Sequence, residues 1–216
     1  MTNATLRIGA PLLALTCLTA PALAMAARPL WFVGVTGGTA RFDSHLADYQ
    51  WNLAPRPAFG AQVGATVGRF GLALRGWSAL AAQHVDASAS VPDPAVRVTT
   101  FDLAGEATLA RGLGAELLAR GSAGRASLSY SPDRVTLDAG GGTTTVDLAP
   151  VHAFTWGAGA ALRRPIAPRW MAALAVERTA LSFETAHRSG SGVTYARETF
   201  GNWNGRLELA RYFGER

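Results

Sequence analysis

The chain has 216 residues, enough for one β-barrel with little left over, and only 16% of its residues are charged. Its 24 glycines and many alanines suit closely packed strands better than a large soluble core. The formal net charge is +5, and every basic residue besides histidine is an arginine. These arginines form no basic block, which argues against a nucleic-acid-binding protein.

The first 24 residues have the features of a secretory signal peptide. Arg7 supplies a positive start, and Ile8–Leu18 is a short apolar stretch. Ala22-Leu23-Ala24 fits the A-x-A cleavage pattern, with Ala24-Met25-Ala26 as the alternative cut. Cys17, the only cysteine, lies in this leader, so the mature chain is expected to have no disulfide and no thiolate metal site. We therefore expect a signal peptide at 1–24 and one domain at 25–216.

Beyond the leader, eight stretches alternate apolar residues with small or polar ones, as β-strands do. They are Trp31–Phe42, Phe59–Gly68, Gly71–Ala82, Val98–Ala110, Ala115–Tyr130, Val151–Leu162, Trp170–Phe183 and Trp203–Phe213. No apolar run after the leader is long enough for a transmembrane helix.

The connections between these stretches alternate between long and short. Long loops are predicted at Asp43–Pro57, His84–Val96, Ser131–Pro150 and Glu184–Gly201, and tight turns at Arg69–Gly71, Arg111–Gly114 and Arg164–Pro168. Barrels of the bacterial outer membrane have short periplasmic turns and longer outside loops. The alternation therefore favours an outer-membrane location.

Each stretch has one apolar face and one face that mixes small residues with charges. In Gly71–Ala82, for example, Leu72 and Leu74 oppose Ala73 and Arg75. A soluble barrel, such as a lipocalin-like carrier, has an apolar interior, whereas a membrane barrel is apolar outside. The pattern predicts an all-β fold, an eight-stranded antiparallel up-and-down transmembrane β-barrel.

The inward face of this barrel is expected to carry a network of charges. Its predicted members are Arg75, Asp102, Glu106, Glu116, Arg120, Glu177, Arg206 and Glu208. An eight-stranded barrel is only wide enough for side chains, and charges inside it must be paired. We expect a salt-bridged plug, and the alternative is a polar path for ions or small solutes.

Aromatic residues near the strand ends are expected at the membrane interfaces. The candidates are Trp31, Trp156, Trp170 and Phe213. Arg178 and Arg211 interrupt the apolar face, so we place them near an interface, where an arginine can extend its charge to water. Arginines there can also pair with lipid phosphates, unless they only solvate the rims.

Five segments resemble a known family: Trp31–Gly38, Phe59–Gly64 with Leu72–Trp77, Glu116–Gly124, Gly157–Trp170, and Leu207–Gly214. They are similar to the eight-stranded membrane domain of outer membrane protein A and its small single-domain relatives. The resemblance covers nearly all of the expected mature chain. It implies an outer-membrane barrel whose closing strand is recognised by the barrel-assembly machinery.

Residues that carry chemistry form no familiar constellation. His45, His84 and His187 lie in or beside long loops, and His152 begins a strand with no serine two positions away. The His-x-Ser motif of outer-membrane lipid A deacylases is therefore absent, and Ser127 and Ser129 are expected to approach His152 only across the rim. The aspartates lack calcium-loop spacing. We expect no enzyme activity, no metal and no cofactor.

The outside loops offer the best candidate contacts. Tyr49 and Trp51, and likewise Tyr195 and Arg197, combine aromatic and polar groups that suit a protein or glycan partner, or that pack on their own loop. The predicted function is a non-enzymatic structural or surface-interaction protein that supports envelope integrity. Its expected partners are outer-membrane lipid and lipopolysaccharide, the barrel-assembly machinery, and an extracellular protein or glycan. The alternatives are a narrow channel and a lipid A-modifying enzyme.

Overall fold

The computed structural model describes residues 28–42, 45–46, 49–51, 54–85, 95–138, 143–189 and 192–214. The signal peptide predicted at 1–24 lies outside these residues. The described part of the chain contains no helix that is long and apolar enough to cross a membrane.

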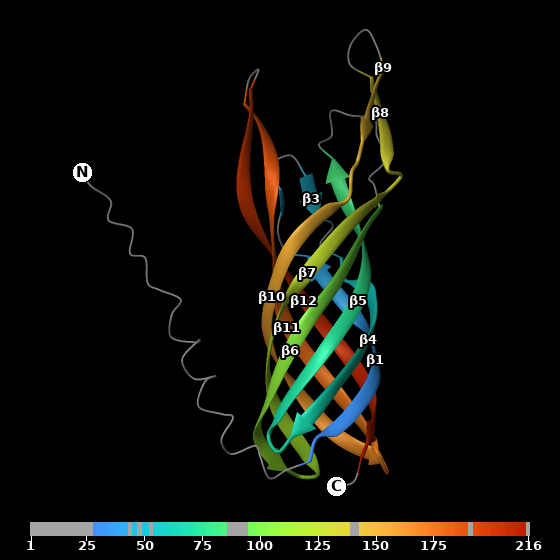
Figure 1. The fold of residues 1–216 in the computed structure, drawn as a ribbon. Helices are drawn as coiled ribbons and strands as arrows, with labels where there is room; N and C mark the ends of the chain where they lie inside the picture. Colours follow the sequence, from blue (N-terminus) through green and yellow to red (C-terminus); the bar gives the residue numbers. More distant parts are fainter. Residues whose placement is uncertain are drawn as a thin grey trace, which may run out of the picture.

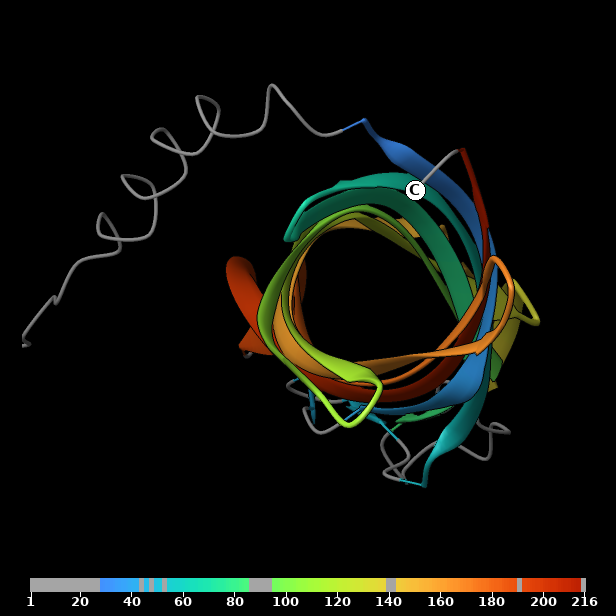
Figure 2. The ribbon, with the colours of Figure 1, turned by 90° about the horizontal axis from the view of Figure 1, so that it is seen from below.

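Eight long antiparallel strands form a closed barrel, seen from the side in Figure 1 and along its axis in Figure 2. They are β1 (Leu30–Phe42), β4 (Arg56–Val67), β5 (Phe70–Val85), β6 (Ala95–Gly112), β7 (Ala115–Ser131), β10 (Val151–Ala167), β11 (Trp170–Ser189) and β12 (Gly192–Phe213). Each strand pairs with the next, and β12 pairs with β1 to close the ring. The predicted eight-stranded antiparallel barrel is confirmed.

Two-residue turns join the strands at the lower end of the barrel in Figure 1: Gly68-Arg69, Leu113-Gly114 and Pro168-Arg169. All three predicted tight turns are present, but their bounds are shifted by up to four residues. β6 ends two residues later than predicted and β10 five residues later, whereas β4 ends one residue earlier. Gly68 and Gly114 have φ angles of 61° and 71°, which glycine adopts without a steric penalty.

At the upper end, the long connections contain paired strands, so the prediction of open loops was wrong there. β11 and β12 stay paired as far as Ser189 and Gly192, and β8 (Arg134–Asp138) pairs with β9 (Thr143–Asp147). β3 (Tyr49–Trp51) adds to the end of β5, and β2 (His45–Leu46) pairs with β3. Backbone pairing needs no apolar face, so these polar segments give no alternation signal.

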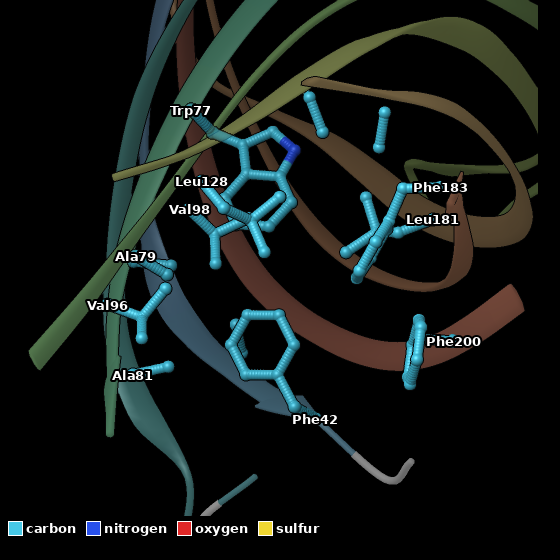
Figure 3. Close-up of a cluster of buried hydrophobic side chains, with 14 residues drawn as sticks. Phe42, Trp77, Ala79, Ala81, Val96, Val98, Leu128, Leu181, Phe183 and Phe200 are labelled. Carbon is cyan, nitrogen blue, oxygen red and sulfur yellow. The ribbon is translucent and has the colours of Figure 1, made fainter. Parts of the chain in front are cut away.

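The upper part of the barrel interior is an apolar core. Figure 3 shows Phe42, Trp77, Val98, Leu128 and Phe200 pointing toward one another from β1, β5, β6, β7 and β12. Phe183 stacks on Phe200 with ring centroids 4.8 Å apart. The sequence pattern predicted small and charged residues along the whole inner face. In the structure, the fully buried charged residues lie below this core.

Candidate functional site

Below the apolar core, the barrel interior holds a network of charged side chains and a smaller apolar cluster around Phe32, Met171 and Tyr212. Arg75 on β5 donates from Nε to Asp102 Oδ1 at 2.7 Å and from Nη1 to Glu177 Oε1 at 2.6 Å. Arg206 on β12 also pairs with Glu177. The side chains of Arg75 and Glu177 are only 4% and 2% exposed, so these ion pairs are shielded from water.

Arg120 on β7 connects this group to a lower one. Its Nη1 is 2.5 Å from Glu208 Oε1, and its Nη2 is 2.7 Å from Glu106 Oε1. The same Nη1 lies 3.9 Å from Glu177 Oε1. The charges on β5, β6, β7, β11 and β12 therefore form one continuous network rather than two.

Arg163 on β10 is an interior residue that the sequence analysis missed. It donates to Glu116 at 2.7 Å, to Glu106 at 3.3 Å and to the Tyr212 hydroxyl at 3.0 Å. The predicted strand ended at Leu162 and the predicted turn began at Arg164, so Arg163 was assigned to neither. Its position continues the inward alternation of β10, which was the available signal.

Glu116 lies at the lower mouth of the barrel, with its side chain 21% exposed. Besides Arg163 it pairs with Arg111 at 3.0 Å. Of the predicted interior charges it is the one nearest to water, and it contacts neither Arg75 nor Arg206 in any described ion pair.

A hydrogen-bonded layer separates the charges from the apolar core. Asn204 donates from Nδ2 to Thr179 Oγ1 at 3.2 Å and to Asn202 Oδ1 at 3.0 Å, and Thr179 donates to Asn202. All three side chains are buried. Amide and hydroxyl groups can satisfy buried polar atoms beside both charged and apolar neighbours.

The lower mouth of the barrel interior is open. A cavity of about 320 Å³ is lined by Arg69, Arg111, Glu106, Arg163 and Tyr212, among others. The next void, beside Arg120 and Glu208, measures about 10 Å³, the space of a single water molecule.

The outer surface carries an apolar band between two groups of aromatic side chains. Trp31, Phe70, Trp170 and Phe213 lie at the lower end, and Phe59, Phe101, Trp156 and Trp203 lie further up, all at least 36% exposed. From Phe213 to Trp203, β12 advances ten residues, which spans roughly 25 Å for a strand tilted by about 40°. That is the height of the apolar band of an outer-membrane barrel.

Trp156 was predicted to lie near a strand end, but it does not. β10 begins five residues before Trp156 and ends eleven residues after it. It belongs to the upper group, which the sequence analysis otherwise missed. Arg178 lies over the Trp203 ring at 5.3 Å, and Arg211 lies 5.4 Å from the Phe213 ring. Both arginines that interrupt the apolar face therefore contact aromatic residues of these two groups.

The candidate loop contacts lie in strands at the upper end. Tyr49 and Trp51 belong to β3, and Tyr195 and Arg197 belong to the upper part of β12. Arg197 is exposed and stands directly opposite Glu184. The side chains of Tyr49, Trp51 and Tyr195 lie outside the described part of the structure.

Ser127 approaches His152 by a different route from the one predicted. Strand register places Ser127 of β7 directly opposite it, so the two residues meet on adjacent strands rather than across the rim. His152 is exposed, on the same outward-facing set of β10 positions as Phe154 and Trp156. The β10–β11 ladder ends at Phe154 and Ser182, two residues short of His152 and Glu184, so it brings no carboxylate to the histidine.

Within the described residues, no group of three histidine, cysteine, aspartate or glutamate side chains is arranged to hold a metal ion.

No protein-family model matches the chain, and no curated protein matches its sequence. Solved structures with the same fold include the following two. Neisserial surface protein A has a TM-score of 0.52 at 8% identity and covers 85% of this chain and 97% of its own. A major outer membrane protein from Thermus thermophilus has a TM-score of 0.52 at 12% identity, with coverage of 86% and 100%. At such identities the similarity establishes the fold alone, which is that of an outer-membrane β-barrel.

Proposed function

We propose that the protein is a non-enzymatic barrel of the bacterial outer membrane, exported with a cleaved signal peptide. It serves the envelope as a membrane-anchored scaffold. The observation that carries this proposal is the combination of an apolar outer band with a filled interior. The outer wall suits contact with lipid, and ion pairs and packed aromatic residues occupy the interior. The upper surface is therefore where we place the function.

The upper end supports a surface-interaction role. The β11–β12 hairpin and the β8–β9 hairpin project beyond the barrel in Figure 1. Strand pairing fixes the backbone of these segments, which lowers the entropy lost when a partner binds. The proposed partners are outer-membrane lipid and lipopolysaccharide, the barrel-assembly machinery during insertion, and an extracellular protein or glycan at the hairpins.

The first experiment compares the electrophoretic mobility of the membrane fraction with and without boiling. A heat-dependent shift, with extraction by detergent but not by carbonate, is the expected result. A soluble periplasmic product without a shift would overturn the proposal.

A channel is disfavoured by the filled interior. Planar-bilayer recordings of the purified protein should give no discrete conductance steps, because an ion would have to displace both the charge network and the apolar core. Steps that change on replacement of Arg75 or Glu106 would establish a channel instead.

The second candidate function is a lipid A-modifying hydrolase, which the register of Ser127 opposite His152 favours. A histidine beside a serine on the outer wall has the composition of an activated nucleophile. The test is the mass of lipid A from cells that express the protein. A mass change that disappears in His152→Ala and Ser127→Ala variants would establish the enzyme, and unchanged lipid A would eliminate it.

A further inference from the structure

One side of the outer wall is hollowed. A shallow, open groove of about 780 Å³ runs over β4, β5 and β6, with Val33 of β1 at its edge, and its outward lining also includes Phe59, Val63, Leu74, Phe101 and Leu103. We name it the β4–β6 groove. It extends along the apolar band from Val33 and Val63 at its lower end to Phe59 and Phe101 of the upper aromatic group.

The groove exists because small residues lie between large ones. Its floor includes Ala61 and Gly76, and Phe59 and Phe101 stand on either side. A Cβ atom at Gly76 would lie 3.0 Å from Phe101 Cε1, so the ring packs directly over the glycine. A larger residue at either floor position would fill the space.

The upper end of the groove changes from apolar to polar. Ser78 and Thr99 line it, and their hydroxyl oxygens are 3.3 Å apart. Arg125 stands directly opposite Phe101 on β7, and Arg97 lies two positions above Thr99 on the same face of β6. Both arginines are exposed. Arg125 therefore stands beside the upper aromatic end of the groove, and Arg97 stands above the hydroxyl pair.

We propose that the β4–β6 groove binds one acyl chain of lipid A, with the headgroup phosphates contacted by Arg97 and Arg125. The inference rests on the proposed outer-membrane location, which places the polar end of the groove at the outer leaflet. An acyl chain fits the apolar lining, the hydroxyl pair meets the linkage region, and guanidinium groups bind phosphate through paired N–H donors. The arginines give the groove the charge that an anionic lipid requires.

The test is native mass spectrometry of the full-length protein from detergent, titrated with lipid A or with phosphatidylglycerol. Wild-type protein should bind one lipid A in preference to phosphatidylglycerol. Ala61→Trp should weaken lipid A binding roughly tenfold or more by filling the groove, and Arg125→Glu should weaken it similarly. Ala160→Trp is the matched control, because Ala160 is an exposed alanine of β10 that does not line the groove.

Equal lipid A binding by Ala61→Trp and Ala160→Trp would overturn the proposal, and so would equal affinity for phosphatidylglycerol. Each variant is first checked for the heat-dependent shift, so that binding is compared only between folded barrels. A wild-type protein that shows the heat-dependent mobility shift but binds no lipid A contradicts only the proposed lipid site in the groove. A wild-type protein that does not shift contradicts the outer-membrane assignment as well.

Discussion

Glu177 is the most heavily engaged carboxylate of the described interior. It accepts from Arg75, pairs with Arg206, and lies 3.9 Å from Arg120, while the residue is 1% exposed. Burying a charge is costly, and here three cations offset that cost. Removing the charge would leave arginines without full compensation in a space that water does not reach.

We therefore expect Glu177→Gln to lower the free energy of unfolding by about 3 kcal/mol. The measurement is guanidinium-induced unfolding in detergent, followed by the heat-dependent mobility shift. Glu184→Gln is the control, since it makes the same change at an exposed position of the same strand. Equal stability of the two variants would show that the network does not hold the barrel together.

At the scale of single elements, the turn between β6 and β7 depends on backbone handedness. Leu113 and Gly114 have φ angles of 51° and 71°, the pattern of a tight hairpin turn that matches strand twist. Glycine adopts this conformation freely, whereas alanine does not.

Gly114→Ala should lower the free energy of unfolding by about 1 kcal/mol, because the alanine would be held in the left-handed region of backbone conformation. Gly112→Ala, two residues away, should cause no loss, because a Cβ there meets nothing within 4 Å and its φ is not positive. Unfolding midpoints in denaturant compare the two. A larger loss in Gly112→Ala would contradict the turn geometry.

The upper hairpins can be shortened without disturbing the barrel. Replacing Ala186–Tyr195 with Asn-Gly leaves Thr185 opposite Ala196 and restores a two-residue turn. The heat-dependent shift should persist, and binding of intact cells to glycan and protein arrays should fall if this hairpin carries recognition.

A matched variant replaces Leu137–Thr144 with Asn-Gly and so shortens the β8–β9 hairpin instead. Loss of array binding in one variant only would locate the contact. Unchanged binding in both would contradict a hairpin-mediated interaction and leave the structural role.

For the molecule as a whole, the apolar band predicts a depth dependence. Leu207 is 62% exposed on β12, midway between Phe213 and Trp203, whereas Thr199 is exposed above the upper aromatic group. In a bilayer, Leu207→Arg should lower the free energy of unfolding by about 2–4 kcal/mol, and Thr199→Arg should lower it by about 0–1 kcal/mol.

Folding into lipid vesicles, followed by denaturant titration, measures both variants. A water-soluble barrel would tolerate arginine equally at two exposed positions, so equal costs would contradict a membrane-spanning band.

The sequence by itself determined which residues face outward and which face inward, because a strand alternates its side chains with a period of two. Leu74 and Arg75 could be assigned to opposite faces without any knowledge of their neighbours. The number of barrel strands and their antiparallel order also followed from the alternating stretches and their connections. Segments above the apolar band gave no such signal, because backbone pairing needs no apolar face.

Only the tertiary structure decided what each inward residue contacts. Arg75 meets Glu177 across 102 positions of sequence, and Ser127 meets His152 through the register of two strands that a long connection separates. The division of the interior into a charge network below and an apolar core above has the same origin. Register and closure set the height of each residue on the barrel, and they depend on the pairing of all eight strands at once.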